Sequence, residues 1–386
     1  MFSLLLYTNC LPENQFLDDY WKTPIPEQGD VPKEFSSLES SLSPKACGSC
    51  HKDQFQAWNE SLHSKTISNG FLWQIPSMQE KDVRRCLSCH SPMTESQAYL
   101  LKNFNFPVEI KKEWKVYLDS DISYDGLSCA NCHLRNHQRF GPPKQSKSNT
   151  FSSRTHNSFN PQPEFEESYF CKKCHDSPDD ANQIKGKKLM EVYKEWSESR
   201  FAKEGVQCQT CHMPERKHLW KGIHDKDMVN SGIEKDLVVK IKDLVEVTAF
   251  VKSVNIGHKF PTYSVPKIYI RIWKLEEGKK TILDERIIGR ILDTSLTQEM
   301  TDTRLLPGET LYITSSFPKS KTPITVFFEA EVEPKEMYQR VFQEKLNSDT
   351  YKDLDSKEKA FLLMALKESK QSKYKLFQIT KKINAD

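Results

Sequence analysis

The feature that most constrains this chain is a short pattern, Cys-x-x-Cys-His, which occurs five times between residues 47 and 212. At this content of cysteine, chance predicts roughly 0.01 copies. The copies are Cys47–His51, Cys86–His90, Cys129–His133, Cys171–His175 and Cys208–His212. Any fold of this chain must therefore accommodate five closely spaced groups of two thiols and an imidazole.

The pattern predicts covalently attached haem. Two cysteines separated by two residues can add to the two vinyl groups of a haem, and the following histidine can ligate the iron. Zinc also binds Cys-x-x-Cys pairs, but it does not require a histidine after the second cysteine in every copy. We therefore expect five c-type haems, attached through Cys47, Cys50, Cys86, Cys89, Cys129, Cys132, Cys171, Cys174, Cys208 and Cys211. Their proximal iron ligands would be His51, His90, His133, His175 and His212.

Haem would also explain how so polar a segment folds. Hydrophobic residues make up 37% of the chain, whereas globular proteins typically have about 45–50%. Five porphyrins would supply the missing apolar surface, so residues 31–230 are expected to wrap the haems as short helices and loops. The same reasoning predicts that this part is largely unfolded without haem.

The remaining histidines are candidates for the second axial position. Low-potential electron carriers usually hold each iron between two histidines, whereas methionine as the sixth ligand raises the potential. Six histidines remain for five irons, and we expect ligands among His63, His156, His218, His224 and His258. His137 follows His133 by four residues and is a weaker candidate that could replace one of them. Methionines close to the motifs remain alternatives: Met78, Met93 and Met213.

Two of these histidines stand out by their local sequence. His63 is expected on a helix over Asp53–Lys65, too far from His51 to reach the same iron, so it would serve another haem. The segment Trp58–His63 is echoed at Trp196–Phe201, with Phe in place of His, although two amphipathic helices could match by coincidence. His258 lies in the turn G-H-K-F-P, which could project it from the C-terminal part onto a haem.

The C-terminal part has a different pattern, with no cysteine after Cys211. Clusters of β-branched residues between turn signals predict strands over Leu237–Ile241, Val245–Val254, Ile268–Lys274, Thr281–Ile288, Thr310–Phe317 and Ile324–Val332. Helices are predicted over Pro334–Leu346 and Ser356–Ser369, and a closing strand over Lys373–Ile383. The expected class is therefore α+β, with a haem-packed, mostly helical or irregular domain over residues 31–230 and a β-sandwich-like domain with terminal helices over 236–386.

The N-terminal residues resemble the end of a bacterial lipoprotein signal. The run M-F-S-L-L-L-Y-T-N-C is apolar and ends at Cys10, which would be the lipidated residue of a signal remnant and linker over residues 1–30. An uncleaved or wrongly assigned start and a free Cys10 are the alternatives. The formal net charge of +3 gives no basic field for binding nucleic acid.

Several motifs have a family likeness. The first haem motif is followed by W-x-x-S-x-H ending at His63, residues 126–133 read G-L-S-C-A-N-C-H, and residues 205–214 read G-V-Q-C-Q-T-C-H-M-P. These segments resemble the multihaem cytochrome c family that includes hydroxylamine oxidoreductase and its tetrahaem electron-acceptor partner. The N-x-G-H-x-F-P-T turn and Leu306–Glu309 resemble the β domain often appended to such cytochromes.

This resemblance implies c-type haems, electron transfer, and translocation to the periplasm or to a membrane-anchored lipoprotein, including the outer membrane. It also implies that loop histidines, His63 most firmly, ligate haems attached elsewhere. The chain departs from the family in three ways. It lacks the lysine-for-histidine motif of pentahaem nitrite reductases, it has no further motifs to match the octahaem enzymes, and Phe201 replaces a histidine.

The leading functional hypothesis is an electron carrier without a catalytic residue of its own. Its partners would be a membrane quinol-oxidising cytochrome, another multihaem protein or a reductase. One alternative is an oxidoreductase that acts on a small nitrogen or sulfur compound at one open haem. Another is a structural subunit that docks partners through the β domain. The sequence does not predict the oligomeric state.

Overall fold

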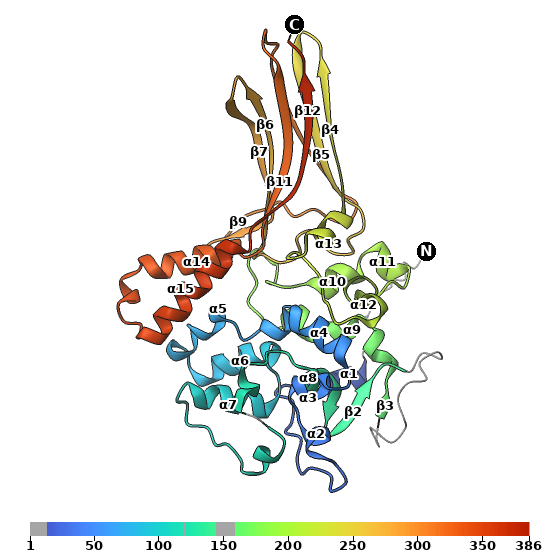
Figure 1. The fold of residues 1–386 in the computed structure, drawn as a ribbon, viewed down its shortest axis with the longest axis vertical. Coiled ribbons are helices and arrows are strands. Elements are labelled where there is room, and N and C mark those ends of the chain that lie inside the picture. Colours follow the sequence, from blue (N-terminus) through green and yellow to red (C-terminus); the bar gives the residue numbers. More distant parts are fainter. Residues whose placement is uncertain (1–13, 119, 144–158, 386) are drawn as a thin grey trace, which may run out of the picture.

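The computed structural model describes residues 14–118, 120–143 and 159–385. Cys10 and His156 lie outside these ranges. The described chain has an α+β fold, as expected, with a body of short helices from which a long β-sandwich projects (Figure 1). Within the described residues, no helix is both long enough and apolar enough to cross a bilayer.

The body consists of short helices and three small strands. Its α-helices are α1 Gln15–Tyr20, α2 Ser37–Ser40, α3 Pro44–Gly48, α4 Lys52–Glu60, α5 Asn69–Leu72, α6 Glu80–His90, α7 Thr94–Asn103, α8 Cys129–His133, α9 Tyr169–His175, α10 Val192–Ser197, α11 Arg200–Lys203, α12 Cys208–His212 and α13 Lys226–Ser231. Its 3₁₀ turns are η1 His63–Lys65, η2 Ile75–Ser77, η3 Glu113–Val116, η4 Ser120–Tyr124, η5 Pro163–Glu166 and η6 Pro214–Arg216. Strands β1 Leu134–Arg135, β2 Gln138–Gly141 and β3 Phe159–Pro161 form one small sheet.

One helix prediction is wrong in extent. The helix expected over Asp53–Lys65 ends at Glu60, and His63 begins a separate 3₁₀ turn. At the end of α4, Ser61 adopts an extended conformation and its hydroxyl donates to the Trp58 carbonyl at 2.7 Å. Serine side chains that bond nearby backbone groups compete with helix continuation. His63 therefore lies outside α4, at the start of η1.

The sandwich consists of a three-stranded sheet and a four-stranded sheet. The first has the order β10-β5-β4 and the second β12-β11-β6-β7, with all pairs antiparallel. The strands are β4 Ile233–Ile241, β5 Leu244–Ser253, β6 Lys267–Glu276, β7 Lys279–Ile288, β10 Thr310–Pro318, β11 Ile324–Glu333 and β12 Tyr374–Ile383; β8 Arg290–Leu292 and β9 Glu299–Asp302 pair separately.

Alternation in the strand sequences explains this packing. Every second residue of β5 from Val245 to Val251 is buried, as expected for a strand with one face against a core. In register, Ala249 lies opposite Leu237 of β4 and Ile313 of β10, and all three belong to one continuous apolar cluster. The two inner faces therefore give the sandwich a core of its own, whereas the body has smaller, separate apolar clusters.

Two further helices connect the sandwich to the body. They are α14 Glu336–Asn347 and α15 Ser356–Gln371, which lie between β11 and β12 in the chain (Figure 1). Phe342 of α14 packs with Trp73 of the body, and the Asn69 amide at the start of α5 donates to Glu368 of α15 at 2.6 Å. The C-terminal helices therefore cover part of the body rather than a face of the sandwich alone.

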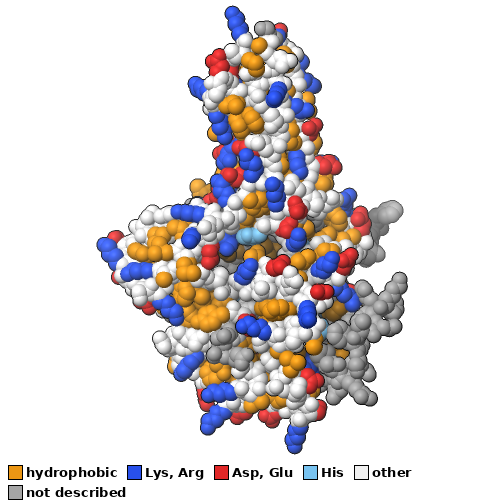
Figure 2. Space-filling model, viewed as in Figure 1, with side chains coloured by type: hydrophobic (Ala, Val, Ile, Leu, Met, Phe, Trp, Pro, Cys, Tyr) orange, Lys and Arg blue, Asp and Glu red, His pale blue; other side chains and the backbone are white. Residues whose placement is uncertain are grey.

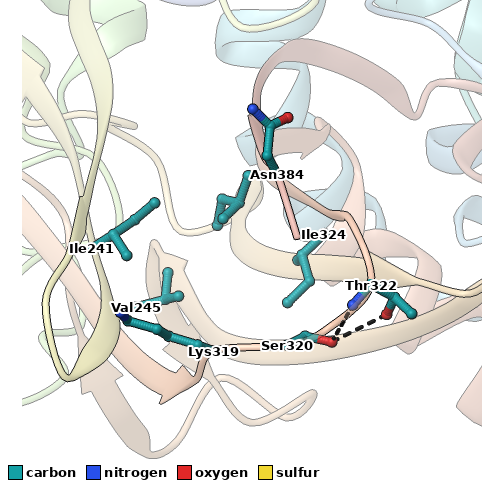
Figure 3. Close-up of a pocket in the computed structure, with 8 residues that line it drawn as sticks. Ile241, Val245, Lys319, Ser320, Thr322, Ile324 and Asn384 are labelled. Carbon is teal, nitrogen blue, oxygen red and sulfur yellow. Dashed lines mark hydrogen bonds between the residues drawn. The ribbon is translucent and has the colours of Figure 1, made fainter. Parts of the chain in front are cut away.

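A small pocket lies beside the β4–β5 turn and the C-terminal end of β12 (Figure 3), at the end of the sandwich distant from the body (Figure 1). Ile241, Val245 and Ile324 lie on its apolar side, and the Ser320 hydroxyl bonds the Thr322 backbone amide and hydroxyl at 3.1 Å each. Its lining includes no cysteine or histidine. All five haem motifs lie in the body.

Candidate haem sites

Four of the five haem motifs lie on a short stretch of helix, and the first lies where two helices meet. The third and fifth motifs occupy α8 and α12 entirely, the second and fourth end α6 and α9, and the first joins α3 to α4. In a helix, residues i, i+3 and i+4 share one face. The helical turn therefore brings both thiols and the imidazole of each motif to one side, which is the arrangement that covalent haem attachment needs.

The predicted proximal histidines are oriented by hydrogen bonds at Nδ1. The Nδ1 atoms of His90, His133 and His212 lie 2.9, 2.7 and 2.6 Å from the carbonyl oxygens of Thr66, Phe140 and Lys221. In His175, Nδ1 instead lies 2.5 Å from the phenol oxygen of Tyr263. A histidine that donates from Nδ1 leaves Nε2 free to bind a metal. The three rings that face carbonyl oxygens are thus held in the tautomer that a haem ligand requires, and the Tyr263 hydroxyl can accept from His175 in the same tautomer.

Three of these histidines face another histidine at similar distances. The ring centres are 6.2 Å apart for His63 and His175, 6.1 Å for His133 and His218, and 6.3 Å for His212 and His258. A first-row metal binds an imidazole nitrogen at about 2.0 Å, and the ring centre lies roughly 1.1 Å behind that nitrogen. Two imidazoles on opposite sides of one iron would therefore have centres roughly 6 Å apart. All three pairs fit a shared iron.

The three pairs differ in the angle between the rings. The planes meet at 78° for His63 and His175, 39° for His133 and His218, and 15° for His212 and His258. The histidines of each pair come from segments distant in the chain. The fourth motif thus pairs with the loop after α4, the third with the loop after α12, and the fifth with the turn before β6.

The protonation state of these rings suits metal binding. Burial lowers the pKa of His63 to about 3, and it lowers the pKa values of His175 and His218 to about 4. Burial also lowers the pKa of His258. The rings are therefore neutral at physiological pH, and neutral imidazole is the form that ligates a metal.

A cavity of about 700 Å³ connects two of the motifs. Its lining includes both members of two histidine pairs, His63 with His175 and His212 with His258, together with the motif thiols Cys171, Cys208 and Cys211. Apolar side chains complete the walls, among them Trp196, Phe201 and Phe260. The space, the attachment thiols and the facing imidazoles together fit haem.

The motifs contact one another through their cysteines. The thiols of Cys47 and Cys129 lie close enough that each shifts the pKa of the other, as do those of Cys89 and Cys174 and those of Cys171 and Cys208. The first motif therefore touches the third, and the fourth touches both the second and the fifth. Cys132 also lies close enough to raise the pKa values of Cys171 and Cys174. The fourth motif is thus at the centre of the cluster.

The other expected ligands are placed differently. His224 lines the same cavity, and burial lowers its pKa to about 4, but among the described residues no histidine ring faces it. His137 is buried in the N-terminal packing, where its Nε2 lies 3.3 Å from the Gly29 carbonyl oxygen and its ring meets Tyr117 edge to face. Met93 is fully buried in an apolar cluster. Ligation by His224 stays a prediction, as does ligation by the paired histidines.

The echo between Trp58–His63 and Trp196–Phe201 extends to the structure. The Trp58 indole donates to the Leu127 carbonyl and the Trp196 indole donates to the Val206 carbonyl, at 2.8 and 3.0 Å. Likewise, the Leu127 amide donates to the His63 carbonyl and the Val206 amide to the Phe201 carbonyl, at 2.9 and 2.8 Å. The two segments are therefore structural equivalents. Where the first provides His63, the second provides Phe201, which packs beside Gly257 next to His258.

Sequence reasoning missed three side chains that contact these histidines or the turn that carries one of them. Trp220 lies edge to face against both His63 and His218, at 4.3 and 5.1 Å between ring centres. Glu195 accepts from the Lys259 amide at 3.0 Å and the Thr262 hydroxyl at 2.7 Å, and so holds the turn that carries His258. The third is Tyr263. Proximity to the motifs was the available signal, since Glu195 precedes Trp196 and Tyr263 follows the G-H-K-F-P-T turn.

Ion pairs fix the same junction. Arg304 lies within 3.4 Å of Glu195 and 2.8 Å of Asp302, while Arg290 bonds Glu299 and the carbonyl oxygens of Ile184 and Lys188. The side chains of Arg290 and Arg304 are 1% and 3% exposed. Figure 2 shows a histidine side chain visible in a hollow where the sandwich meets the body, among interspersed basic and acidic residues.

Comparison with known proteins bears on the haem motifs rather than on the histidine pairs. The family model described as cytochrome c554 and c-prime matches residues 46–109 and 128–213, which contain all five motifs. A penta-heme cytochrome c552 from Thermochromatium tepidum superposes with a TM-score of 0.60 at 18% identity, covering 89% of this chain and 100% of that chain. No curated protein sequence matches significantly. The specific likeness to hydroxylamine oxidoreductase stays a prediction. The family match and the similar fold support a multihaem cytochrome c with covalently bound haem.

Proposed function

We propose that this protein is a pentahaem c-type cytochrome that carries electrons between extracytoplasmic redox partners through closely spaced, mostly bis-histidine haems. The observation that carries the proposal is the set of three histidine pairs at 6.1–6.3 Å, each combining a motif histidine with a histidine from a distant segment. When bound, haem supplies a reversible one-electron couple at each iron. Histidine at both axial positions favours electron transfer over substrate binding.

The residues of the chain would divide this task as follows. The ten motif cysteines would hold the haems, and the paired histidines would ligate three of the irons: His63 with His175, His133 with His218, and His212 with His258. Motif thiols that lie close together bring neighbouring sites together. The first motif lies next to the third and the third next to the fourth, and the fourth also lies next to the second and the fifth. Such an order would let electrons enter at one edge of the cluster and leave at another.

The partners proposed are a membrane quinol-oxidising cytochrome, another multihaem protein or a terminal reductase. An extracytoplasmic location, periplasmic or lipid-anchored through Cys10, would match the oxidising compartment in which c-type haems are attached. The face shown in Figure 2 carries interspersed charges of both signs, which suits transient docking of redox proteins.

Electron counting tests the proposal. The purified holoprotein should contain five haems by intact mass and take up five electrons per molecule in an anaerobic reductive titration. The reduced protein should then pass these electrons to an oxidised small cytochrome. Fewer than five haems would contradict the pentahaem assignment, and reduction without onward transfer would contradict the carrier function.

A second candidate function has one observation in its favour. His90, in the second motif, has the Phe71 ring stacked on it at 5.3 Å and 15°, and no histidine ring faces it among the described residues. Cys86 of the same motif packs against an apolar cluster that includes Phe71 and Leu87. This environment would suit an open haem that reacts with a small nitrogen or sulfur compound. Binding of nitric oxide or cyanide to one haem would support this function, and five unreactive haems would exclude it.

A further inference from the structure

Tyr263 contacts a predicted haem ligand in a way that differs from the contacts at the other motifs. Three motif histidines have an amide carbonyl oxygen as the partner of Nδ1, whereas His175 has the phenol oxygen of Tyr263 at 2.5 Å. Tyr263 does not belong to the body's haem motifs. It lies between the turn that carries His258 and the first residue of β6. A side chain from the sandwich therefore reaches the proximal ligand of the central site.

We propose that Tyr263 is a positioning residue that tunes the reduction potential of the haem held by His175, an inference that rests on the proposed function. A hydrogen bond accepted from Nδ1–H raises the basicity of a ligating histidine. A neutral phenol oxygen is a weaker acceptor than an amide carbonyl oxygen, so His175 donates less electron density than the other motif histidines do. A weaker donor stabilises ferric iron less, which raises the potential.

The opposite ligand of the same site acts in the same direction. The Nδ1 atom of His63 is buried and has no hydrogen-bond partner among the described residues. By contrast, the Nδ1 atoms of His218 and His258 lie 3.0 and 2.9 Å from the carbonyl oxygens of Arg216 and Lys259. Both ligands of the fourth haem are therefore weaker donors than those of the other two described pairs. The fourth haem should have the highest potential of the three.

The position of this site gives the tuning a role. The fourth motif touches the second and fifth motifs through Cys174 and Cys171. A central haem of raised potential would collect electrons from its neighbours. The segment from His258 to Tyr263 contacts the ligands of two adjacent sites, His212 and His175, and Glu195 holds it against the body. The sandwich thereby influences two haems at once.

The angle between paired rings allows this haem to be assigned in a spectrum. Nearly perpendicular imidazole planes give low-spin ferric haem a highly anisotropic electron paramagnetic resonance signal, whereas nearly parallel planes give a rhombic signal. The planes meet at 78° for His63 and His175, against 15° for His212 and His258. The potential of the fourth haem can therefore be followed separately during a redox titration.

The test is Tyr263→Phe in the full holoprotein, titrated potentiometrically with electron paramagnetic resonance detection. Removal of the acceptor should raise the reduction potential of the haem that gives the highly anisotropic signal. The rise should be up to ~59 mV for this one-electron couple, which corresponds to a change of about tenfold in the reduction equilibrium constant. The reduction potential of the haem that gives the rhombic signal should not change. The matched control is Tyr374→Phe, which also removes a hydroxyl at the junction, one that donates to the Ile223 carbonyl at 2.7 Å and touches no histidine.

A second measurement serves as the test if Tyr263→Phe loses haem. Fluorotyrosine incorporated throughout the unaltered sequence makes the phenol oxygen a poorer acceptor without changing its position, and it should raise the same potential. The role of Tyr263 is contradicted if neither Tyr263→Phe nor fluorotyrosine changes the reduction potential of the haem with the anisotropic signal. It is also contradicted if the potential of the haem with the rhombic signal changes instead. The electron count and onward transfer would be unaffected by that result, so the proposed function would stand or fall separately.

Discussion

His258 lies in a turn of the sandwich yet faces His212 of the fifth motif, with ring planes only 15° apart. Replacing His258 with Met should raise the potential of one haem, because thioether is a weaker donor than imidazole. Replacing it with Ala should leave that iron high-spin. Redox titration and the optical spectrum of the oxidised protein measure these outcomes. His137→Gln is the control, since His137 bonds a backbone carbonyl and faces no motif histidine; equal effects of both variants would count against ligation by His258.

Glu195 is the residue that holds this turn. Its carboxylate accepts from Lys259 and Thr262 and pairs with Arg304, and its side chain is 8% exposed. Glu195→Gln removes the charge but leaves Arg304 paired with Asp302, so the free energy of unfolding should fall by about 1–3 kcal/mol. Denaturant titration measures the loss. Glu198→Gln, at the exposed C-cap of the same helix, should lower the free energy of unfolding by less than about 0.5 kcal/mol. Comparable losses in the two variants would contradict the role of Glu195 in holding the turn.

At the scale of single residues, the sequence identified candidate ligands but not which histidine rings would face one another. The motifs identify ten cysteines and five histidines because the chemistry of haem attachment fixes the spacing. The pairing of His63 with His175, or of His218 with His133, depends on how distant loops fold and leaves no local signal. Tyr263 and Glu195 act through a ligand or a turn, so no motif marks them.

At the scale of elements, Gly126 fixes the loop that presents His63. Its φ is +62°, and a Cβ atom there would lie 2.7 Å from the His63 carbonyl oxygen and 2.9 Å from that of Ser64. Gly126→Ala should therefore destabilise the protein by about 3 kcal/mol and disturb the most anisotropic haem signal. Thermal unfolding and electron paramagnetic resonance check both effects.

The control for this change is Gly278→Ala. Gly278 has a similar φ of +77° in the β6–β7 hairpin, but a Cβ atom would meet nothing within 4 Å. Gly278→Ala should lower the free energy of unfolding only through backbone strain, by about 1–2 kcal/mol, and should leave the haem signals unchanged. If the two variants behave alike, close packing against the His63 loop is not what Gly126 provides.

The strands were predictable and the body was not. Each predicted strand from Leu237 to Val332 corresponds to an observed strand with ends within a few residues, because alternation and turn residues act locally. In the body, hydrogen bonds of Ser61 end α4 before the predicted boundary. Its short helices are set by the haem motifs and their contacts rather than by periodicity.

At the scale of the whole molecule, the two parts should differ in their dependence on haem. The sandwich has one continuous apolar core, whereas the body has separate clusters and a cavity of about 700 Å³. Protein made without haem attachment should therefore lose the body to limited proteolysis and keep a fragment that begins near residue 230. The holoprotein should resist the same treatment throughout. An apoprotein that is equally resistant in the body would show that haem does not organise it.

The central claim is that the paired histidines share irons. Electron paramagnetic resonance of the fully oxidised protein, with spins counted against total haem, tests it most directly. The three pairs predict that at least three of five haems are low-spin and that one of them gives a highly anisotropic signal. High-spin signals from more than two haems, or the absence of the anisotropic signal, would contradict the claim.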